Sequence, residues 1–108
     1  MHGTAEELCA DPGVDAVIVA TTTTTHEEYS VLAASHGKHI LCEKPMARDC
    51  LEARRMVDAA RAAGVSLCVA YRRRLFPQVV AAKRLIEEGR IGEVVSVRTH
   101  YSGNMDIE

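Results

Sequence analysis

The stretch His39–Met46, HILCEKPM, joins a short apolar run to a Glu-Lys-Pro triplet. An apolar run of this length, ended by a turn-forming proline, predicts a buried strand of a parallel sheet. Ligands of open α/β sheets bind at the C-terminal ends of the strands. Lys44 is therefore expected where chemistry takes place, although its position alone would favour a solvated charge.

Two similar runs lie before and after this stretch, separated from it by helical patterns. Val14–Ala20, VDAVIVA, is a β-branched run that we expect to form a central strand covered on both faces. Val65–Ala70, VSLCVA, predicts a third buried strand. Strands that alternate with helices through short connections require right-handed crossovers and a parallel sheet. The fold class is therefore α/β, with half of a doubly wound nucleotide-binding sheet.

Capping patterns predict where the helices begin. Pairs of a short polar residue and an acidic residue three positions later are typical of helix N-termini, and they occur at Thr4/Glu7, Thr25/Glu28 and Asp49/Glu52. We expect helices from Thr4 to Ala10, from His26 to about Ser35, and from Asp49 to the residue before Gly64.

The chain changes character near residue 90. A further helix is predicted from Pro77 to Glu88, with an inner stripe of Val79, Ala82 and Ile86. After a glycine-rich break, Glu93–Tyr101 alternates apolar and polar residues, which predicts a half-exposed strand of an antiparallel sheet. We therefore expect residues 1–90 to be a partial dinucleotide-binding domain and residues 91–108 to begin an antiparallel α+β second domain.

Composition excludes several classes of partner. The 13 Lys and Arg residues balance 15 Asp and Glu residues, so we expect neither nucleic-acid nor membrane binding. The N-terminus lacks the apolar core of a signal peptide, and the four cysteines form no Cys-x-x-Cys pair. Cys42 and Cys68 fall in predicted buried strands, so free thiols in a reducing cytoplasm are favoured over disulfides or zinc. The five histidines show no metal spacing, so no metal is expected.

The motifs together resemble the glucose–fructose oxidoreductase and inositol dehydrogenase family of NAD(P)-dependent sugar oxidoreductases. The resemblance rests on four stretches in order: DAVIVAT…H, GKHILCEKP, GVSLCVAYRRR and GRIGEVVSV. It implies a Rossmann domain followed by a larger domain with an open antiparallel sheet, NAD or NADP as cofactor, a sugar or polyol substrate and possible homo-oligomers. None of the seven glycines forms the Gly-x-Gly of a phosphate-binding turn. The chain therefore looks like a fragment that would be inactive alone.

The resemblance also implies roles for individual residues. Lys44 is similar to the family's proton-transfer lysine. A group that takes up a proton is needed there, because alcohol oxidation by hydride loss requires the hydroxyl proton to leave. Lys44 and Glu43 are expected beside the cofactor, although Glu43 could instead cap its own turn. The remaining expected cofactor-binding residues are Thr21, Thr22, His26 and Arg74. His26 could also be an ordinary histidine in the first turn of a helix.

Two functions of different classes remain open at this point. The first is a piece of an oxidoreductase that acts on a hydroxylated small molecule. The second is a non-catalytic α/β module that binds a ligand or partner. The Glu-Lys-Pro triplet favours the first, and the missing glycine-rich turn would favour the second if these residues were the whole protein. A Gly-x-Gly-x-x-Gly encoded upstream would decide between them.

Overall fold

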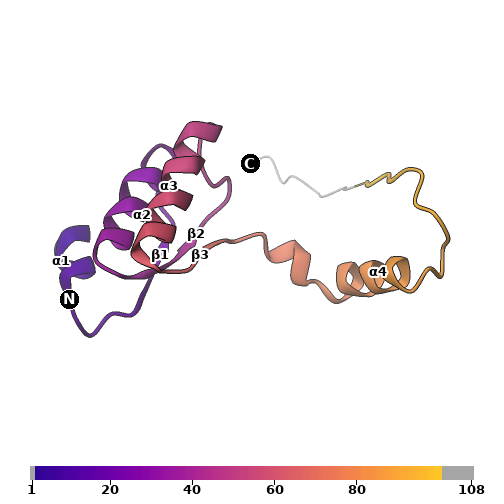
Figure 1. Cartoon of the computed structure of the whole chain (residues 1–108), viewed down its shortest axis with the longest axis horizontal. Helices are drawn as coiled ribbons and strands as arrows, with labels where there is room; N and C mark the ends of the chain where they lie inside the picture. Colours follow the sequence, from indigo (N-terminus) through magenta and orange to yellow (C-terminus); the bar gives the residue numbers. More distant parts are fainter. Residues whose placement is uncertain (1, 101–108) are drawn as a thin grey trace, which may run out of the picture. The chain divides into compact units, whose positions relative to one another are not determined.

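The computed structural model describes residues 2–100, and the chain divides into two compact units, Met1–Tyr71 and Arg72–Glu108. Each unit is described by itself. The first unit contains, in order, α1 (Ala5–Ala10), β1 (Ala16–Val19), the short 3₁₀ helix η1 (Thr23–Thr25), α2 (His26–Ser35), β2 (His39–Cys42), α3 (Cys50–Ala63) and β3 (Leu67–Val69) (Figure 1).

The three strands form a parallel sheet in the order β1-β2-β3, which confirms the predicted sheet class. Val17 of β1 lies opposite Ile40 of β2, and Ile40 lies opposite Leu67 of β3. Both crossovers move the chain in the same direction across the sheet. Because such crossovers are right-handed, their helices α2 and α3 fall on the same face.

The core lies between that face and the two helices, which run side by side (Figure 1). Val17, Ile40 and the fully buried Met56 of α3 are among its members. The alternate strand residues point the other way, and Ile18 and Leu41 are 72% and 39% exposed. The expectation that the first strand is covered on both faces is therefore wrong, because both crossover helices of this unit cover one face.

The ends of the helices follow the predicted caps in two of three cases. Thr4 Oγ1 accepts a hydrogen bond from Glu7 N at 3.1 Å, and Asp49 accepts two from the first turn of α3. Gly64 ends α3 with a φ of 68°, as expected of a glycine in the left-handed region. The capping box at Thr25 is wrong. Thr25 belongs to η1, which runs directly into α2, so its hydroxyl bonds within the preceding loop.

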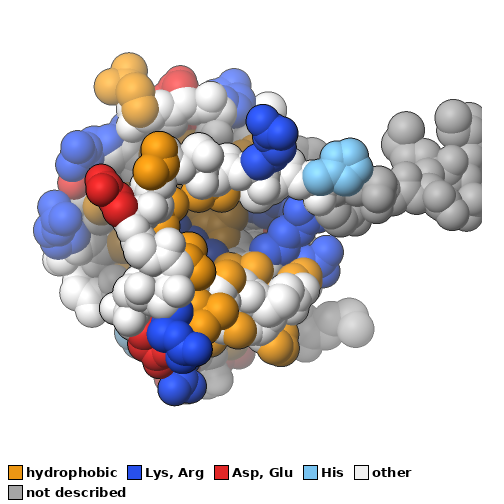
Figure 2. Space-filling model, turned by 90° about the vertical axis from the view of Figure 1, so that its right-hand side faces the viewer, with side chains coloured by type: hydrophobic (Ala, Val, Ile, Leu, Met, Phe, Trp, Pro, Cys, Tyr) orange, Lys and Arg blue, Asp and Glu red, His pale blue; other side chains and the backbone are white. Residues whose placement is uncertain are grey.

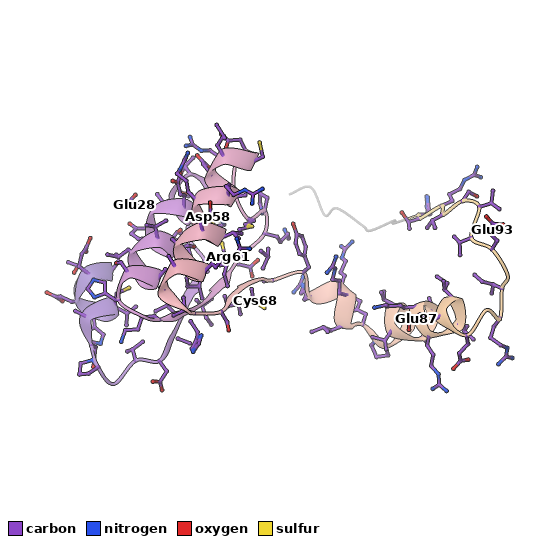
Figure 3. All side chains as sticks on the ribbon, in the orientation of Figure 1. Glu28, Asp58, Arg61, Cys68, Glu87 and Glu93 are labelled. Carbon is purple, nitrogen blue, oxygen red and sulfur yellow. The ribbon has the colours of Figure 1, made fainter. Side chains whose placement is uncertain are left out.

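The cysteines differ in exposure and are all free thiols. Cys9 and Cys42 are buried, whereas Cys50 and Cys68 are exposed. Cys68 lies on β3 (Figure 3). The expectation that Cys68 is buried in its strand is wrong for the same reason as for Ile18, because both belong to alternate positions of a sheet that has one exposed face.

The second unit begins with the 3₁₀ helix η2 (Arg72–Leu75) and continues with α4 (Pro77–Glu87). Proline at the first position of α4 agrees with the prediction. Val79 and Ile86 are 42% and 43% exposed, so the expected inner stripe is not buried in the structure. On the face drawn in Figure 2, hydrophobic side chains lie at the surface beside lysines and arginines.

The alternating segment forms no strand over residues 93–100, and Tyr101 lies outside the described residues. Val95 and Val97 are 90% and 77% exposed. A strand needs a neighbour to pair with its backbone N–H and C=O groups, and no segment within residues 2–100 pairs with this one. The predicted strand is therefore not seen, and the domain boundary near residue 90 stays a prediction.

Candidate functional site

The C-terminal ends of β1 and β2 bring two predicted site segments to the same edge of the sheet. Val19 lies opposite Cys42 in the register, and Glu43 N donates to Val19 O at 2.9 Å. The threonine loop, Thr21–Thr25, leaves β1 at this edge, and the turn Glu43–Met46 leaves β2 beside it. The two segments therefore lie side by side, as expected of loops that follow the C-terminal ends of neighbouring parallel strands.

The threonine loop presents a cluster of hydroxyl groups. Thr25 Oγ1 lies 2.8 Å from Thr21 Oγ1 and 3.0 Å from the Thr22 carbonyl oxygen. Thr22 Oγ1 lies 2.9 Å from Thr24 Oγ1. Thr21, Thr22 and Thr24 are exposed, so their remaining hydrogen-bonding capacity faces solvent. Such hydroxyls can bond the oxygen atoms of a sugar or a phosphate.

The turn Glu43–Met46 exposes both of its charged side chains. Glu43 Oε2 accepts a hydrogen bond from Lys44 N at 3.1 Å, which is the turn-capping contact considered for it. The Lys44–Pro45 peptide bond is cis. Lys44 makes no ion pair with any residue of the described range, so its amine is available to a bound molecule.

His26 lies beneath the two loops and touches both. Its side chain is 1% exposed. Nδ1 lies 2.9 Å from the Pro45 carbonyl oxygen, and Nε2 lies 3.2 Å from the Thr21 carbonyl oxygen. The structure therefore joins His26 to the predicted site through the backbone, while its expected contact with the cofactor stays a prediction.

Cys42 supports the same turn and was not singled out from the sequence as part of the site. Its thiol is buried, and Sγ lies 3.4 Å from the Glu43 carbonyl oxygen and 3.9 Å from that of Met46. Burial raises the pKa of the Cys42 thiol, so it stays protonated near neutral pH. Its position as the last residue of the strand was the one available signal.

Two ion pairs hold the helices that begin behind the loops. The Arg55 guanidinium of α3 donates to the carboxylate of Glu27 in the first turn of α2, with Nη2 2.9 Å from Oε2. Glu52 of α3 is buried and accepts from Arg48 Nε at 2.7 Å and from Arg48 N at 3.0 Å. Hydrogen bonds from Arg55 and Arg48 lower the pKa values of Glu27 and Glu52, respectively.

An apolar pocket of about 270 Å³ lies along β1, and Thr21 is its contact with the threonine loop. Leu8, Val17, Ile18 and Tyr29 are among its lining residues. The pocket is therefore adjacent to the candidate site. It continues along β1, on the side of that strand that is not paired with β2.

Arg74, the remaining expected cofactor-binding residue, lies in η2 of the second unit. Its expected place beside the nicotinamide stays a prediction. Within residues 2–100, no group of three His, Cys, Asp or Glu side chains could hold a metal ion. No helix in that range combines the length and apolar character needed to cross a membrane.

Comparisons with known proteins agree with the fold of the first unit. Residues 3–71 match the family described as "Oxidoreductase family, NAD-binding Rossmann fold". The chain is 45% identical to 1,5-anhydro-D-fructose reductase of Ensifer adhaerens, covering 90% of this chain and 29% of that protein. It is 43% identical to levoglucosan dehydrogenase of Pseudarthrobacter phenanthrenivorans, covering 84% of this chain and 23% of that protein.

A solved structure shows the same likeness in three dimensions. It is the WlbA dehydrogenase from Bordetella pertussis in complex with NADH and UDP-GlcNAcA, with a TM-score of 0.79 and 33% identity over 84% of this chain and 26% of that one. The chain thus spans less than a third of the length of each of these three proteins. It belongs to the Gfo/Idh/MocA oxidoreductase family, whose matched domain is an NAD-binding Rossmann fold.

Proposed function

We propose that residues 1–108 are part of an NAD(P)-dependent oxidoreductase that transfers hydride between a nicotinamide cofactor and a sugar, polyol or similar hydroxylated substrate. The observation that carries the proposal is the meeting of the threonine loop and the Glu-Lys-Pro turn at one sheet edge. The names of two relatives, a 1,5-anhydro-D-fructose reductase and a levoglucosan dehydrogenase, support the substrate class.

The residues at this edge fit one part of a dinucleotide. Exposed hydroxyls of Thr21 and Thr22 can bond ribose or phosphate oxygens, and the Glu43 carboxylate can accept hydrogen bonds from ribose hydroxyls. The backbone donors for a pyrophosphate come from a glycine-rich turn before a helix, and the sequence has no Gly-x-Gly. We therefore expect the 108-residue chain alone to have no useful affinity for NAD or NADP and to be inactive.

Lys44 is the proposed proton-transfer residue. A bound nicotinamide would supply the acceptor or donor of the hydride that the substrate carbon loses or gains. As that carbon loses hydride, its hydroxyl must lose a proton for the carbonyl to form, and the neutral Lys44 amine accepts it. In the reverse direction the Lys44 ammonium returns the proton to the oxygen. The exposed side chain, without an ion-pair partner in the described range, is compatible with both steps.

Other parts of the proposal concern the longer protein. We propose that Arg74 lies near the nicotinamide and substrate, and that the dinucleotide passes over the two loops that the buried His26 ring contacts. The second domain would begin near residue 91 and add an antiparallel sheet. A cytoplasmic location is proposed from the free cysteines, and homo-oligomers are proposed from the family resemblance. Neither nucleic acid nor a membrane is a proposed partner.

The test uses the complete protein encoded by the reading frame that contains this chain. NAD⁺ or NADP⁺ reduction is followed with a panel of sugars and polyols, and cofactor binding is measured by calorimetric titration. The proposal expects hydride transfer by the complete protein and no measurable binding by residues 1–108. Ligand binding by the complete protein without turnover on any substrate would support the non-catalytic module instead. A micromolar dissociation constant of the 108-residue chain for NAD would contradict the proposed division of the cofactor site.

A further inference from the structure

The His26 ring lies between two backbone carbonyl groups. Nδ1 faces the Pro45 oxygen at 2.9 Å, and Nε2 faces the Thr21 oxygen at 3.2 Å. Carbonyl oxygens only accept hydrogen bonds, so each ring nitrogen can bond its neighbour only when it carries a proton. A neutral imidazole carries one proton, and the ring must place it on one of the two nitrogens.

We propose that His26 is a positioning residue that fixes the Glu43–Met46 turn by donating from Nδ1–H to the Pro45 carbonyl oxygen. Pro45 follows Lys44 directly, so this bond holds the backbone from which the Lys44 side chain extends. The role in catalysis rests on the proposed function, because it acts through Lys44. The hydrogen bond itself does not depend on that function.

The contacts of the turn support this role. His26 reaches the turn from the start of α2, 19 residues away in sequence, and its other nitrogen faces the threonine loop. The Cys42 thiol contacts the carbonyls of Glu43 and Met46. Buried groups therefore hold the backbone of the turn, while the side chains of Glu43 and Lys44 stay exposed.

The distances favour Nδ1 as the donor. The separation of 2.9 Å from the Pro45 oxygen is typical of an N–H···O hydrogen bond, whereas 3.2 Å is at the long end of the usual range. A bare Nδ1 would direct its lone pair at the lone pairs of a carbonyl oxygen. A ring that carries its proton on Nδ1 alone avoids this repulsion at the shorter contact and leaves a bare nitrogen only at the longer one, beside the Thr21 oxygen. A ring that carries protons on both nitrogens donates to both oxygens.

Burial argues against direct contact between this ring and a ligand. The side chain is 1% exposed, and both nitrogens already face carbonyl oxygens. A ligand contact would require the ring to give up one of them. His26 therefore acts indirectly and orients Lys44 without touching the substrate or the cofactor.

The first experiment records the protonation of the ring by ¹⁵N–¹H NMR of the complete protein labelled at histidine. The proposal expects a proton on His26 Nδ1, protected from exchange with water. His36, which is exposed at the other end of α2, is the internal control and should exchange quickly. A His26 ring with its proton on Nε2 alone would overturn the proposal, whether or not the protein is an oxidoreductase.

The second experiment compares three substitutions in hydride transfer. His26→Asn places an amide nitrogen on Cγ, where Nδ1 is attached, whereas His26→Gln extends toward the position of Nε2, and His26→Phe has no donor. Because misplacement of a catalytic group by about 1 Å can cost about 100-fold in rate, we expect His26→Phe to lower kcat by at least tenfold. His26→Asn should recover most of this loss, and His26→Gln should recover little.

Cofactor affinity separates positioning from direct binding. The dissociation constant for NAD(P) should change by less than about threefold in all three variants, whereas misplacement of a catalytic group can lower the reaction rate by about 100-fold. His36→Asn should have the kcat and the dissociation constant of the wild type. Equal kcat values for the Asn, Gln and Phe variants would overturn the positioning role. So would a loss of cofactor affinity that matches the loss of kcat. Absence of turnover in the wild-type protein would refute the proposed function, and the NMR result would still decide on the hydrogen bond.

Discussion

Replacing Met56 by alanine should destabilise the first unit more than any comparable change on the surface of α3. Met56 is 0% exposed and packs in the same core as Val17, Ile40 and Cys42. Met→Ala in a core costs about 2–5 kcal/mol, because apolar contacts are lost and a cavity remains. A unit of 71 residues at about 0.05–0.15 kcal/mol per residue has a free energy of unfolding of roughly 4–11 kcal/mol. The substitution should therefore remove about half of it.

Urea denaturation followed by circular dichroism measures this loss. Small proteins have m-values of about 1–3 kcal/mol per molar urea, so with a value of about 2 the loss of about 2–5 kcal/mol should lower the midpoint by roughly 1–2.5 M. Leu51→Ala is the matched control, because Leu51 lies on the same helix and is 66% exposed. Its effect should stay within about 0.5 kcal/mol. Equal midpoints for the two variants would refute the packing of α3 against the sheet through Met56.

Three further predictions concern pH, a helix end and the exposed sheet face. The hydrogen bond from Arg48 lowers the pKa of Glu52 from its ordinary value near 4.5. The stabilisation of the fold by ionised Glu52 should therefore be complete above pH 4.5 and be lost as the pH falls through the lower pKa of the folded state. Glu52→Gln should therefore flatten the acid limb of a stability–pH curve, and an unchanged limb would contradict this. Gly64→Ala should lower the free energy of unfolding by about 1–2 kcal/mol, measured in urea, because the residue has a φ of 68°; a neutral effect would refute the strain. The isolated chain should self-associate through the open edge of β1 and its exposed face, and Ile18→Lys should reduce this in sedimentation velocity. A monodisperse wild-type monomer would contradict it.

Local patterns in the sequence predicted much of the fold. The bounds of β2, His39–Cys42, agree with the apolar run because the Glu-Lys-Pro turn ends it abruptly. Thr4 and Asp49 cap their helices because the side chain and its backbone partner lie three residues apart. Thr25 has the same local pattern but differs in its neighbours, since η1 precedes it without a break. Propensity alone could not reveal that continuity.

The exposure of the strands was beyond the sequence pattern. Ile18 is as apolar as Val17 and Val19 on either side of it, so the run indicates burial on both faces. The structure of this unit covers only the face on which both crossover helices lie. Similarly, the alternation in residues 93–100 is typical of a strand but could not supply the neighbouring strand that it needs.

The candidate site was predictable where its residues follow strand ends. The threonine loop and Lys44 were located by the parallel topology. The contacts that support them were not, because they join distant residues: His26 with Pro45 across 19 positions, and Glu27 with Arg55 across 28. No local spacing encodes such pairs, so their roles depend on the folded geometry.

The most direct test of the central claim is hydride transfer by Lys44→Met in the complete protein, with NAD(P) binding measured in parallel. Methionine keeps much of the lysine stem and removes the amine. Loss of a positioned acid–base group typically lowers the rate by about 10²–10⁴, so turnover should fall by at least 100-fold with little change in cofactor affinity. Lys44→Arg should not restore it, because a guanidinium stays protonated. Retention of more than about a tenth of wild-type turnover by Lys44→Met, far short of the loss expected for an acid–base group, would contradict the assignment of Lys44 as the proton-transfer residue.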